Sequence, residues 1–440
     1  MQTSALADVT DLLARALRGS DAGAWIDLDE RVRAALRWGG PAPAALAWSP
    51  TAAEREPGAP ELAVALCGPD GRRREAALPW AGRTPELLPL VVVRCADWAE
   101  PVRVRARAEL VAALPGLAPE ALERLTAVAL RLGGRRHGGT AREVLTARLR
   151  EEPETCAAAL LDSGDRAVRR LAHRVAVERG LLSPARLAQV AATDHDVVVQ
   201  DLCANAALAA AGDAVGASVL GPLLGSRLGR VRAAGVTALH RAGRAGEAEP
   251  FLYDRSGLVR ACARWALRQA GTDPVPLYRA ACAAGDAVLS DAPLGLAECG
   301  DRATDSETLW ALTEHPRSRV RASAVAGLRH LGAAHLRRLA PLLRDDSPRV
   351  VRETAKALAP WADHFPAGAL LPPARPGVVY EATDEEPGKE PERKPEAEPQ
   401  PEPAGRARRA LRALRLFRLP FGRRPPAEQP SGAAERAVRA

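Results

Sequence analysis

Histidine and cysteine are the side chains most often used for catalysis or metal binding, and neither is spaced for that chemistry in this sequence. The eight histidines include His330 and His335, which stand five positions apart and so off a shared helix face, and no H-E-x-x-H sequence occurs. No G-x-S-x-G sequence marks a serine nucleophile. The sequence therefore predicts no catalytic residue, no metal ligand and no cofactor, and we expect the chain not to be an enzyme.

Two polar segments leave a chemical alternative open. Asp194-His195-Asp196 is typical of a polar turn, although these side chains could also transfer a proton or bind a metal. The run GGRRHGG at residues 133–139 could hold a phosphate through exposed amides and its two arginines. It lacks the lysine of a P-loop and the spacing of a dinucleotide site, so the sequence favours a surface loop.

The seven cysteines indicate a reducing environment. They are scattered without any C-x-x-C pair, and most fall on apolar helix positions where a free thiol packs as a small hydrophobe. The first residues, MQTSALADVTDLLARAL, do not resemble a signal peptide, and no run of about eighteen apolar residues is present. We therefore expect a cytoplasmic protein without a transmembrane segment.

Arginine is a third side chain that could have a functional role, and in this sequence it recurs directly after a valine. Such a row of guanidinium groups could contact phosphates, or it could be used inside the fold. The pairs are Val102-Arg103, Val168-Arg169, Val231-Arg232, Val259-Arg260, Val320-Arg321 and Val351-Arg352.

The anchor valines recur at a nearly fixed spacing. Around Val320 the sequence RSRVRASAVAGLRHL contains a polar turn, the Val-Arg pair and a stretch rich in small residues. The anchor recurs at 168, 199, 231, 259, 288, 320 and 350, at intervals of 31, 32, 28, 29, 32 and 30 residues, and an earlier copy at 102 precedes 168 by 66. A period of this size is the signature of a repeat array.

Each repeat is expected to be a pair of helices. After each anchor, Val, Ala and Leu recur at three and four positions and so share one helix face. An apolar stretch upstream, such as SPARLAQVAAT or DSETLWALTEH, supplies the first helix of the pair. One pair is too small to bury its own apolar stripe, so it needs neighbours on both sides.

This pattern resembles the HEAT repeat, in particular the short HEAT-like variety known from bilin lyases. The resemblance covers roughly residues 60–365 and implies an all-α fold, an α-α superhelix of the solenoid type. In such repeats the arginine usually bonds the turn carbonyls or an Asp of a neighbouring unit. Five acids stand close before their anchors and fit that role, namely Asp97, Asp165, Asp254, Asp286 and Asp346.

The N-terminal part is less regular. Two amphipathic helices are expected near Ser4–Leu17 and Asp27–Trp38, with Trp25, Trp38 and Trp48 packing against the open end of the array. Residues 61–80 could form a β-hairpin around Pro69-Asp70-Gly71, but placing Arg74 in the arginine slot fits the repeat period and favours a helix pair.

The C-terminal part changes character after residue 365. Residues 381–405 carry nine acids and three bases, and residues 406–426 carry eight arginines. We expect four regions: a helical cap at 1–57, a repeat solenoid at 58–365, an acidic Pro/Glu-rich linker at 366–405 and a basic amphipathic tail at 406–440, the last two disordered. The tail residues that could contact an anionic surface are Arg408, Arg409, Arg412, Arg415 and Arg418.

Three functional classes are compatible with this organisation. The favoured one is a non-catalytic scaffold that binds a so far unidentified protein partner. A nucleic-acid binder with a basic concave face is the alternative, and a lyase-type enzyme is the third, implied by the resemblance alone. The formal net charge of +8 favours nucleic acid or anionic membrane, but only three of the basic residues are lysine, and an excess of Arg and Ala also reflects a GC-rich coding sequence.

Overall fold

The computed structural model describes residues 4–19, 21–38, 48, 56–151 and 154–364. These residues form helices and the turns between them, and they contain no strand. The predicted all-α solenoid is therefore confirmed. The predicted linker and tail, with the five tail arginines, lie outside the described residues, and the predicted region boundaries stay predictions.

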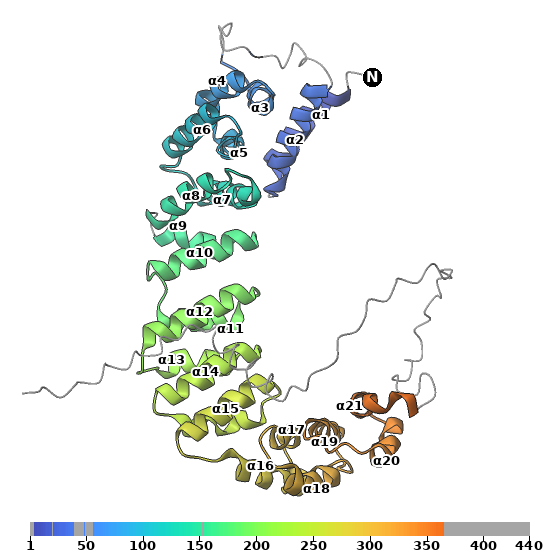
Figure 1. Ribbon diagram of the computed structural model, residues 1–440. Helices are drawn as coiled ribbons and strands as arrows, with labels where there is room; N and C mark the ends of the chain where they lie inside the picture. The colour runs from blue at the N-terminus through green and yellow to red at the C-terminus, as the bar shows by residue number, and fades with distance from the viewer. Residues whose placement is uncertain (1–3, 20, 39–47, 49–55, 152–153, 365–440) are drawn as a thin grey trace, which may run out of the picture. The chain divides into compact units, whose positions relative to one another are not determined.

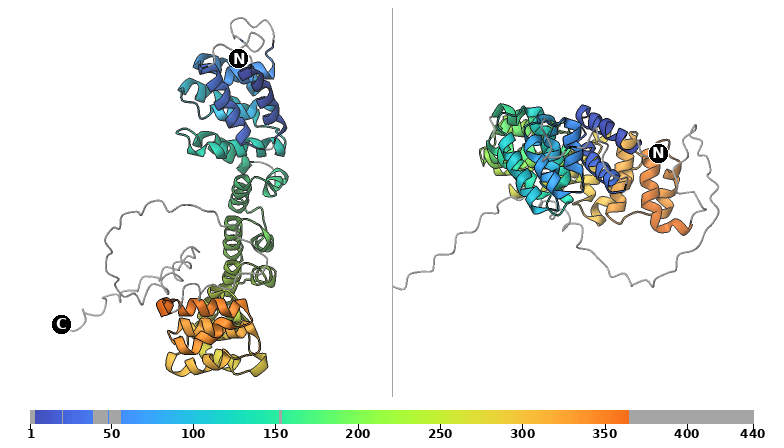
Figure 2. Two further views of the ribbon diagram at one scale, coloured as in Figure 1. Left: turned by 90° about the vertical axis from the view of Figure 1, so that its right-hand side faces the viewer. Right: turned by 90° about the horizontal axis from the view of Figure 1, so that it is seen from above.

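The helices group into two compact units. The first comprises the described residues up to Phe251 together with Cys262–Thr272, and the second comprises Leu252–Ala261 together with the described residues from Asp273 onward. Within each unit, helices that follow one another in the chain lie next to one another, as the colour gradient shows (Figures 1 and 2).

The first unit begins with α1 (Ser4–Arg18) and α2 (Gly23–Trp38) and continues as helix pairs. The second helix begins four residues before the predicted Asp27, because Asp21 accepts a hydrogen bond from the amide of Gly23. The pairs are α3 (Ala59–Cys67) with α4 (Gly71–Gly82), α5 (Leu88–Arg94) with α6 (Glu100–Ala113), α7 (Pro119–Arg131) with α8 (Gly139–Glu151), α9 (Glu154–Leu161) with α10 (Arg166–Glu178), α11 (Pro184–Thr193) with α12 (Val197–Ala211), and α13 (Ala217–Leu224) with α14 (Gly229–Arg241). Short 3-10 helices are η2 (Pro85–Leu87) and η3 (Leu132–Gly134).

The repeat continues into the second unit. A 3-10 helix, η4 (Ala245–Tyr253), takes the place of a first α-helix before α15 (Gly257–Gln269), and both elements have residues in each unit. The later elements are α16 (Pro274–Cys282), η5 (Gly285–Ala287), α17 (Ala292–Ala297), α18 (Arg302–Leu312), α19 (Ser318–His330), α20 (Leu336–Leu339), η6 (Ala340–Arg344), α21 (Pro348–Leu358) and η7 (Ala359–His364).

Residues 61–80 form a helix pair, as the repeat period predicts, and not a hairpin. Asp70 lies at the N-cap of α4, where its carboxylate accepts a hydrogen bond from the amide of Arg72 at 2.9 Å. A capping acid of this kind satisfies an amide that has no partner inside the helix. The same arrangement begins α10 at Asp165 and α12 at Asp196.

The second helices also share a stop signal. A glycine twelve residues after the anchor adopts a positive φ, and the next amide bonds the carbonyl eight residues after the anchor, which is a Schellman-type end. The glycines are Gly180, Gly243, Gly271 and Gly332, and the amide-to-carbonyl bonds are Leu181–Ala176, Arg244–Leu239, Thr272–Leu267 and Ala333–Leu328, each 2.8–2.9 Å long.

The anchor valines form the seams of the stack. Each is 0 or 1 % exposed, at positions 102, 168, 199, 231, 259, 288, 320 and 350. Small residues allow the close approach that these seams require. A Cβ on Gly235 in α14 would come within 2.9 Å of Leu224, and one on Gly327 in α19 would come within 3.0 Å of the Pro293 carbonyl.

One predicted repeat departs from the pattern. The anchor Val288 is buried, but it follows η5 and does not begin a helix, and the second helix of this unit is shortened to α17. Pro293 at the second position of α17 cannot donate a helical amide bond and is tolerated only at a helix start. The helix therefore begins four residues after the anchor, whereas the regular second helices begin two residues before theirs.

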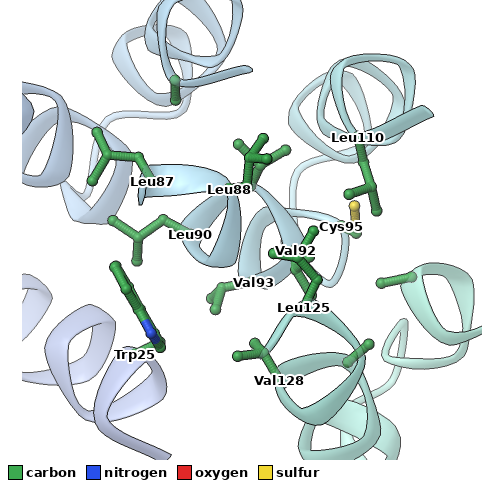
Figure 3. Close-up of a cluster of buried hydrophobic side chains, with 14 of the residues drawn as sticks. Trp25, Leu87, Leu88, Leu90, Val92, Val93, Cys95, Leu110, Leu125 and Val128 are labelled. Carbon is green, nitrogen blue, oxygen red and sulfur yellow. The ribbon is translucent and has the colours of Figure 1, made fainter. Parts of the chain in front are cut away.

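The N-terminal helices cover the first pairs. Figure 3 shows side chains of α2, α5, α6 and α7 converging on one apolar cluster, with Trp25 beside Leu90 and Leu125 and Val128 facing α5. Trp25 and Trp48 are buried, whereas the side chain of Trp38 lies outside the described ones.

The seam at Val231 can be tested by burying a charge. We expect Val231→Asp to lower the free energy of unfolding by about 3–5 kcal/mol, because the carboxylate would have no partner in an apolar seam. Val104→Asp, at an exposed valine of α6, is the matched control and is expected to change it by about 0.5 kcal/mol or less. Chemical denaturation followed by circular dichroism measures both, and equal effects would show that the buried face is wrongly assigned.

Candidate interaction surface

The recurring arginine reaches back to the preceding helix. In six second helices its Nη1 donates to the carbonyl six residues earlier, at the end of the first helix or in the turn after it. The pairs are Arg74–Gly68 (2.9 Å), Arg103–Asp97 (2.9 Å), Arg169–Ser163 (3.0 Å), Arg232–Ser226 (2.7 Å), Arg260–Asp254 (2.7 Å) and Arg321–His315 (3.0 Å). In α12 the amide nitrogen of Gln200 makes the equivalent bond to the Asp194 carbonyl.

This bond has a clear physical reason. The last carbonyls of a helix have no partner inside it and carry the negative end of the helix dipole. A guanidinium at the start of the following helix satisfies them and holds the turn closed. Five of the six arginines that the sequence offers as a basic ladder are therefore used inside the fold, the exception being Arg352.

Several of these arginines also bind an acid of the next repeat. Arg74 forms two bonds of 2.9 Å with Asp97, and Arg321 forms two of 2.8 Å with Asp345. Arg260 contacts Glu298 in the same way. The hydrogen bond from Arg321 holds the pKa of Asp345 below its ordinary value. Each such arginine joins three segments, namely its own helix, the preceding turn and the following pair.

The acids that the sequence predicts as partners of the recurring arginines are only in part the acids that bind them in the structure. Asp97 binds Arg74 through its carboxylate, as the resemblance implies. Asp254 instead offers its main-chain carbonyl, Asp165 is bound by Arg131, and Asp345 takes the place of the expected Asp346.

The last Val-Arg pair is out of register. Val350, eight residues before Leu358, is the buried anchor of α21, and Val351 occupies the arginine slot and is buried. Arg352 is therefore one position too far along, lies exposed, and makes no bond to a turn carbonyl within the described part of the chain. The two adjacent valines are both buried, and the start of α21 at Pro348, two residues before Val350 as in the regular repeats, selects the first register.

A buried ionic cluster lies under the first repeats. The carboxylate of Asp29 in α2 binds Arg94 at 2.5 Å, and Arg94 also binds Asp97 at 2.8 Å. Arg74, Arg94, Asp29 and Asp97 are each at most 3 % exposed. Removing one partner of such a cluster leaves an uncompensated buried charge.

An exposed tryptophan covers this cluster. Trp98, in the turn before α6, is stacked between the guanidinium groups of Arg33 and Arg74, whose carbons lie 4.3 and 3.9 Å from the centre of one of its rings. Burial, and then the charge of Arg94, lowers the pKa of Arg33. The sequence does not reveal this cluster, because its acids and bases come from separate repeats.

Asp194-His195-Asp196 and the loop at residues 133–139, for which the sequence leaves a chemical role open, bind side chains of other helices. Asp196 caps α12 and accepts bonds of 2.8 Å from both Arg166 and Arg170. In the glycine-rich loop, Arg135 donates to Glu30 of α2 at 2.8 Å. Within the described residues, no group of three or more His, Cys, Asp or Glu side chains is placed to hold a metal ion. None of the described helices is long and apolar enough to cross a membrane.

The exposed large apolar side chains lie on one kind of element. Among the residues that the structure describes there are seven, all on second helices or on the turns that lead into them, namely Trp98, Val104, Val111, Val197, Val198, Trp265 and Leu289. Three of them belong to α6 and its turn, where Val104 is 63 % and Val111 51 % exposed. Isolated exposed valines are ordinary, but a row of them on one helix marks an interaction face.

Helix α6 carries such a row along its full length. Val104, Ala108 and Val111 follow the four- and three-residue spacing of one helix face, and all are exposed. Pro101 and Pro115, also exposed, stand at the two ends of α6. We call this row the α6 stripe. The sequence contains part of the signal, since Val104 stands two residues after the anchor, where the other repeats carry polar or small residues.

A hollow of about 490 Å³ adjoins the α6 stripe. It lies between α6 and α8, with Val111, Leu114 and Val144 in its apolar lining and charged groups at its rim. Arg107, on the same side of α6, is exposed and has no ion-pair partner within the residues that the structure describes. The face therefore combines apolar contact area with an available cation.

Comparisons with known proteins identify no family. No protein-family model and no curated protein matches the sequence. Among solved structures, the chain is similar to the karyopherin Kap121p, in a structure where that protein is bound to the extreme C-terminus of the protein phosphatase Cdc14p. The two sequences are 13 % identical, the TM-score is 0.31, and the match covers 80 % of this chain and 45 % of the karyopherin. An engineered protein is 18 % identical in sequence at a TM-score of 0.23, and the match covers 80 % of this chain and 98 % of the engineered chain. Similarity at this level identifies neither partner nor activity, and membership of the short HEAT-like variety stays a prediction.

The buried arginine is the most sensitive point of the first repeats. We expect Arg74→Met to lower the free energy of unfolding by about 3–5 kcal/mol, because Asp97 would lose two hydrogen bonds while buried. Arg105→Met is the matched control. Arg105 pairs with Glu109 on the surface, so the expected change is about 1 kcal/mol or less. Equal losses in urea titrations of the two variants would contradict the assignment.

The ionised carboxylate of Asp196 is expected to contribute to the free energy of unfolding, and this contribution is expected to be lost in acid. The hydrogen bond from Arg170 is the main cause that lowers its pKa in the folded chain. A lowered folded pKa stabilises the fold above the unfolded value of about 3.9, and this contribution is lost as the pH falls below it. We expect Asp196→Asn to be less stable at pH 7 and the difference from wild type to shrink below about pH 4. Denaturation midpoints from pH 7 to 3 measure this, and a difference independent of pH would contradict it.

Proposed function

We propose that this chain is a non-catalytic scaffold that binds a protein partner through the exposed face of α6 in its first unit. The observation that supports this proposal most directly is the α6 stripe with the hollow beside it. Val104 and Val111 expose apolar area to solvent on a helix whose other face is fully used in the core. Apolar side chains with arginine nearby are the composition of residues that contribute most to protein interfaces.

The chemistry of the surface defines the partner. The row on α6 is suited to an amphipathic helix, whose apolar residues would lie along it and enter the hollow beside Val144. Arg107 would meet a carboxylate of that helix, since it has no ion-pair partner among the described residues. A partner helix with apolar residues on one face and an acid beside them fits both features.

The use of arginine inside the fold supports this proposal over nucleic-acid binding. Five of the six arginines of the expected ladder, and Arg74 in the same slot of α4, donate to turn carbonyls, and several also bind an acid. Phosphate contacts need guanidinium groups whose donors are free. The tail arginines from Arg408 to Arg418 lie outside the described residues, and weak contact of that tail with an anionic membrane or nucleic acid stays a prediction.

The proposal is tested by charge on the stripe. We expect Val104→Glu/Val111→Glu to lose a bound protein that co-purifies with the full chain, while the thermal midpoint changes little because both side chains are exposed. Val197→Glu/Val198→Glu, at exposed valines of α12, is the matched control and is expected to retain it.

The protein lost from the first variant is then purified, and its affinity is measured by calorimetry. A weakening of about a hundredfold is expected, which corresponds to roughly 2.7 kcal/mol. Equal affinity of wild type and stripe variant, or binding of labelled duplex that weakens steeply with salt in place of protein binding, would contradict the proposal.

A further inference from the structure

The last repeats of the second unit are rich in basic side chains. Between Leu331 and Leu358 there are six basic and three acidic side chains, a net charge of +3. The bases are Arg337, Arg338, Arg344, Arg349, Arg352 and Lys356, and the acids are Asp345, Asp346 and Glu353. We call these residues of α20, η6 and α21 the terminal basic surface.

Two of its three acids are already engaged. Asp345 is held by Arg321 of α19 at 2.8 Å, and Glu353 is bound by Lys356 at 2.7 Å. Three exposed arginines, Arg337, Arg344 and Arg352, have no ion pair or hydrogen bond with any described residue. The surface therefore offers several cations without a partner.

A hollow of about 470 Å³ opens beside this surface, between α18 and α20. Trp310 and His335 line it, and the guanidinium of Arg338 lies 4.0 Å from the centre of a Trp310 ring. Arg302 adds a further cation, while the one acid in the lining, Asp301, caps α18 through the amide of Thr304. An aromatic and cationic lining suits a ligand with an aromatic ring and carboxylates.

The chain itself provides a ligand of this kind. The described residues end at His364, and sixteen residues later comes Tyr380, followed by Glu381, Asp384, Glu385 and Glu386 without a base between them. This is the densest acidic run beyond residue 364, because residues 387–402 hold five acids and three bases. The segment Tyr380–Glu386 thus matches the terminal basic surface in charge and the hollow in its aromatic ring.

The connecting chain is long enough for this contact. Sixteen extended residues span up to about 55 Å, whereas packed helices lie about 8–10 Å apart. α18, α20 and α21 belong to the same unit. A tether of this length holds the segment at an effective concentration of about 1 mM, so individually weak charge contacts suffice.

We propose that Tyr380–Glu386 binds the terminal basic surface of its own chain, with Tyr380 at the Trp310 hollow and the carboxylates on Arg337, Arg344 and Arg352. The segment acts as a built-in occupant, so that an outside acidic peptide binds there only by displacing it. This site lies in the second unit and is independent of the α6 stripe, so either proposal can fail alone.

The test compares two full-length variants with the same change of charge. Asp384→Lys/Glu385→Lys/Glu386→Lys reverses the proposed contact, and Glu396→Lys/Glu398→Lys/Glu402→Lys is the matched control farther along the chain. Hydrogen–deuterium exchange is measured on all three proteins. The first variant is expected to speed exchange about threefold or more in residues 333–358, while the control leaves it unchanged.

The remaining outcomes decide against the proposal. Equal exchange in all three proteins, as expected if the acids meet the arginines at 406–424, would overturn it. Equal acceleration by both triple variants would show general charge attraction without a defined segment. Protection that rises with protein concentration over a tenfold range would place the segment on a second copy of the chain and would also overturn the intramolecular contact.

Discussion

The bond from a guanidinium to a carbonyl six residues earlier is the interaction on which the rest of this structure depends. It occurs at the start of six second helices and satisfies carbonyls that the preceding helix leaves without partners. Where the same arginine also binds an acid of the next repeat, as Arg321 binds Asp345, it fixes both the turn within a pair and the position of the following pair.

Repeats without this arginine show how the constraint is replaced. Gln200 makes the same carbonyl bond in α12, where Asp196 gathers Arg166 and Arg170 from the preceding repeat. In the unit around Val288 the slot holds Leu289, and the second helix is shortened to α17. The carbonyl of Val288 is then satisfied by Arg317 from the following repeat. The carbonyl bond is thus replaced directly in α12, whereas in α21 the buried Val351 fills the slot.

The repeat could be predicted from the sequence because its determinants are local. An anchor valine and small residues at helical spacing lie within one segment, and each of the eight anchor valines is buried in the structure. The cluster of Asp29, Arg94 and Asp97 could not be predicted, since its members meet only after separate helices have packed. The final repeat shows the limit of a local sequence pattern, because Val350 and Val351 are adjacent and both buried, and the start of α21 at Pro348 identifies Val350 as the anchor.

The central claim is that the recurring arginine couples neighbouring repeats, and a double-mutant cycle on Arg321 and Asp345 tests it most directly. The pair joins α19 to the turn before α21 through two bonds of 2.8 Å. The free energy of unfolding would be measured for wild type, Arg321→Met, Asp345→Asn and the double variant. The account predicts a coupling energy of about 1–3 kcal/mol, with each single variant costing nearly as much as the double. Additive losses, with a coupling near zero, would show that the repeats are held together by apolar packing alone and would contradict it.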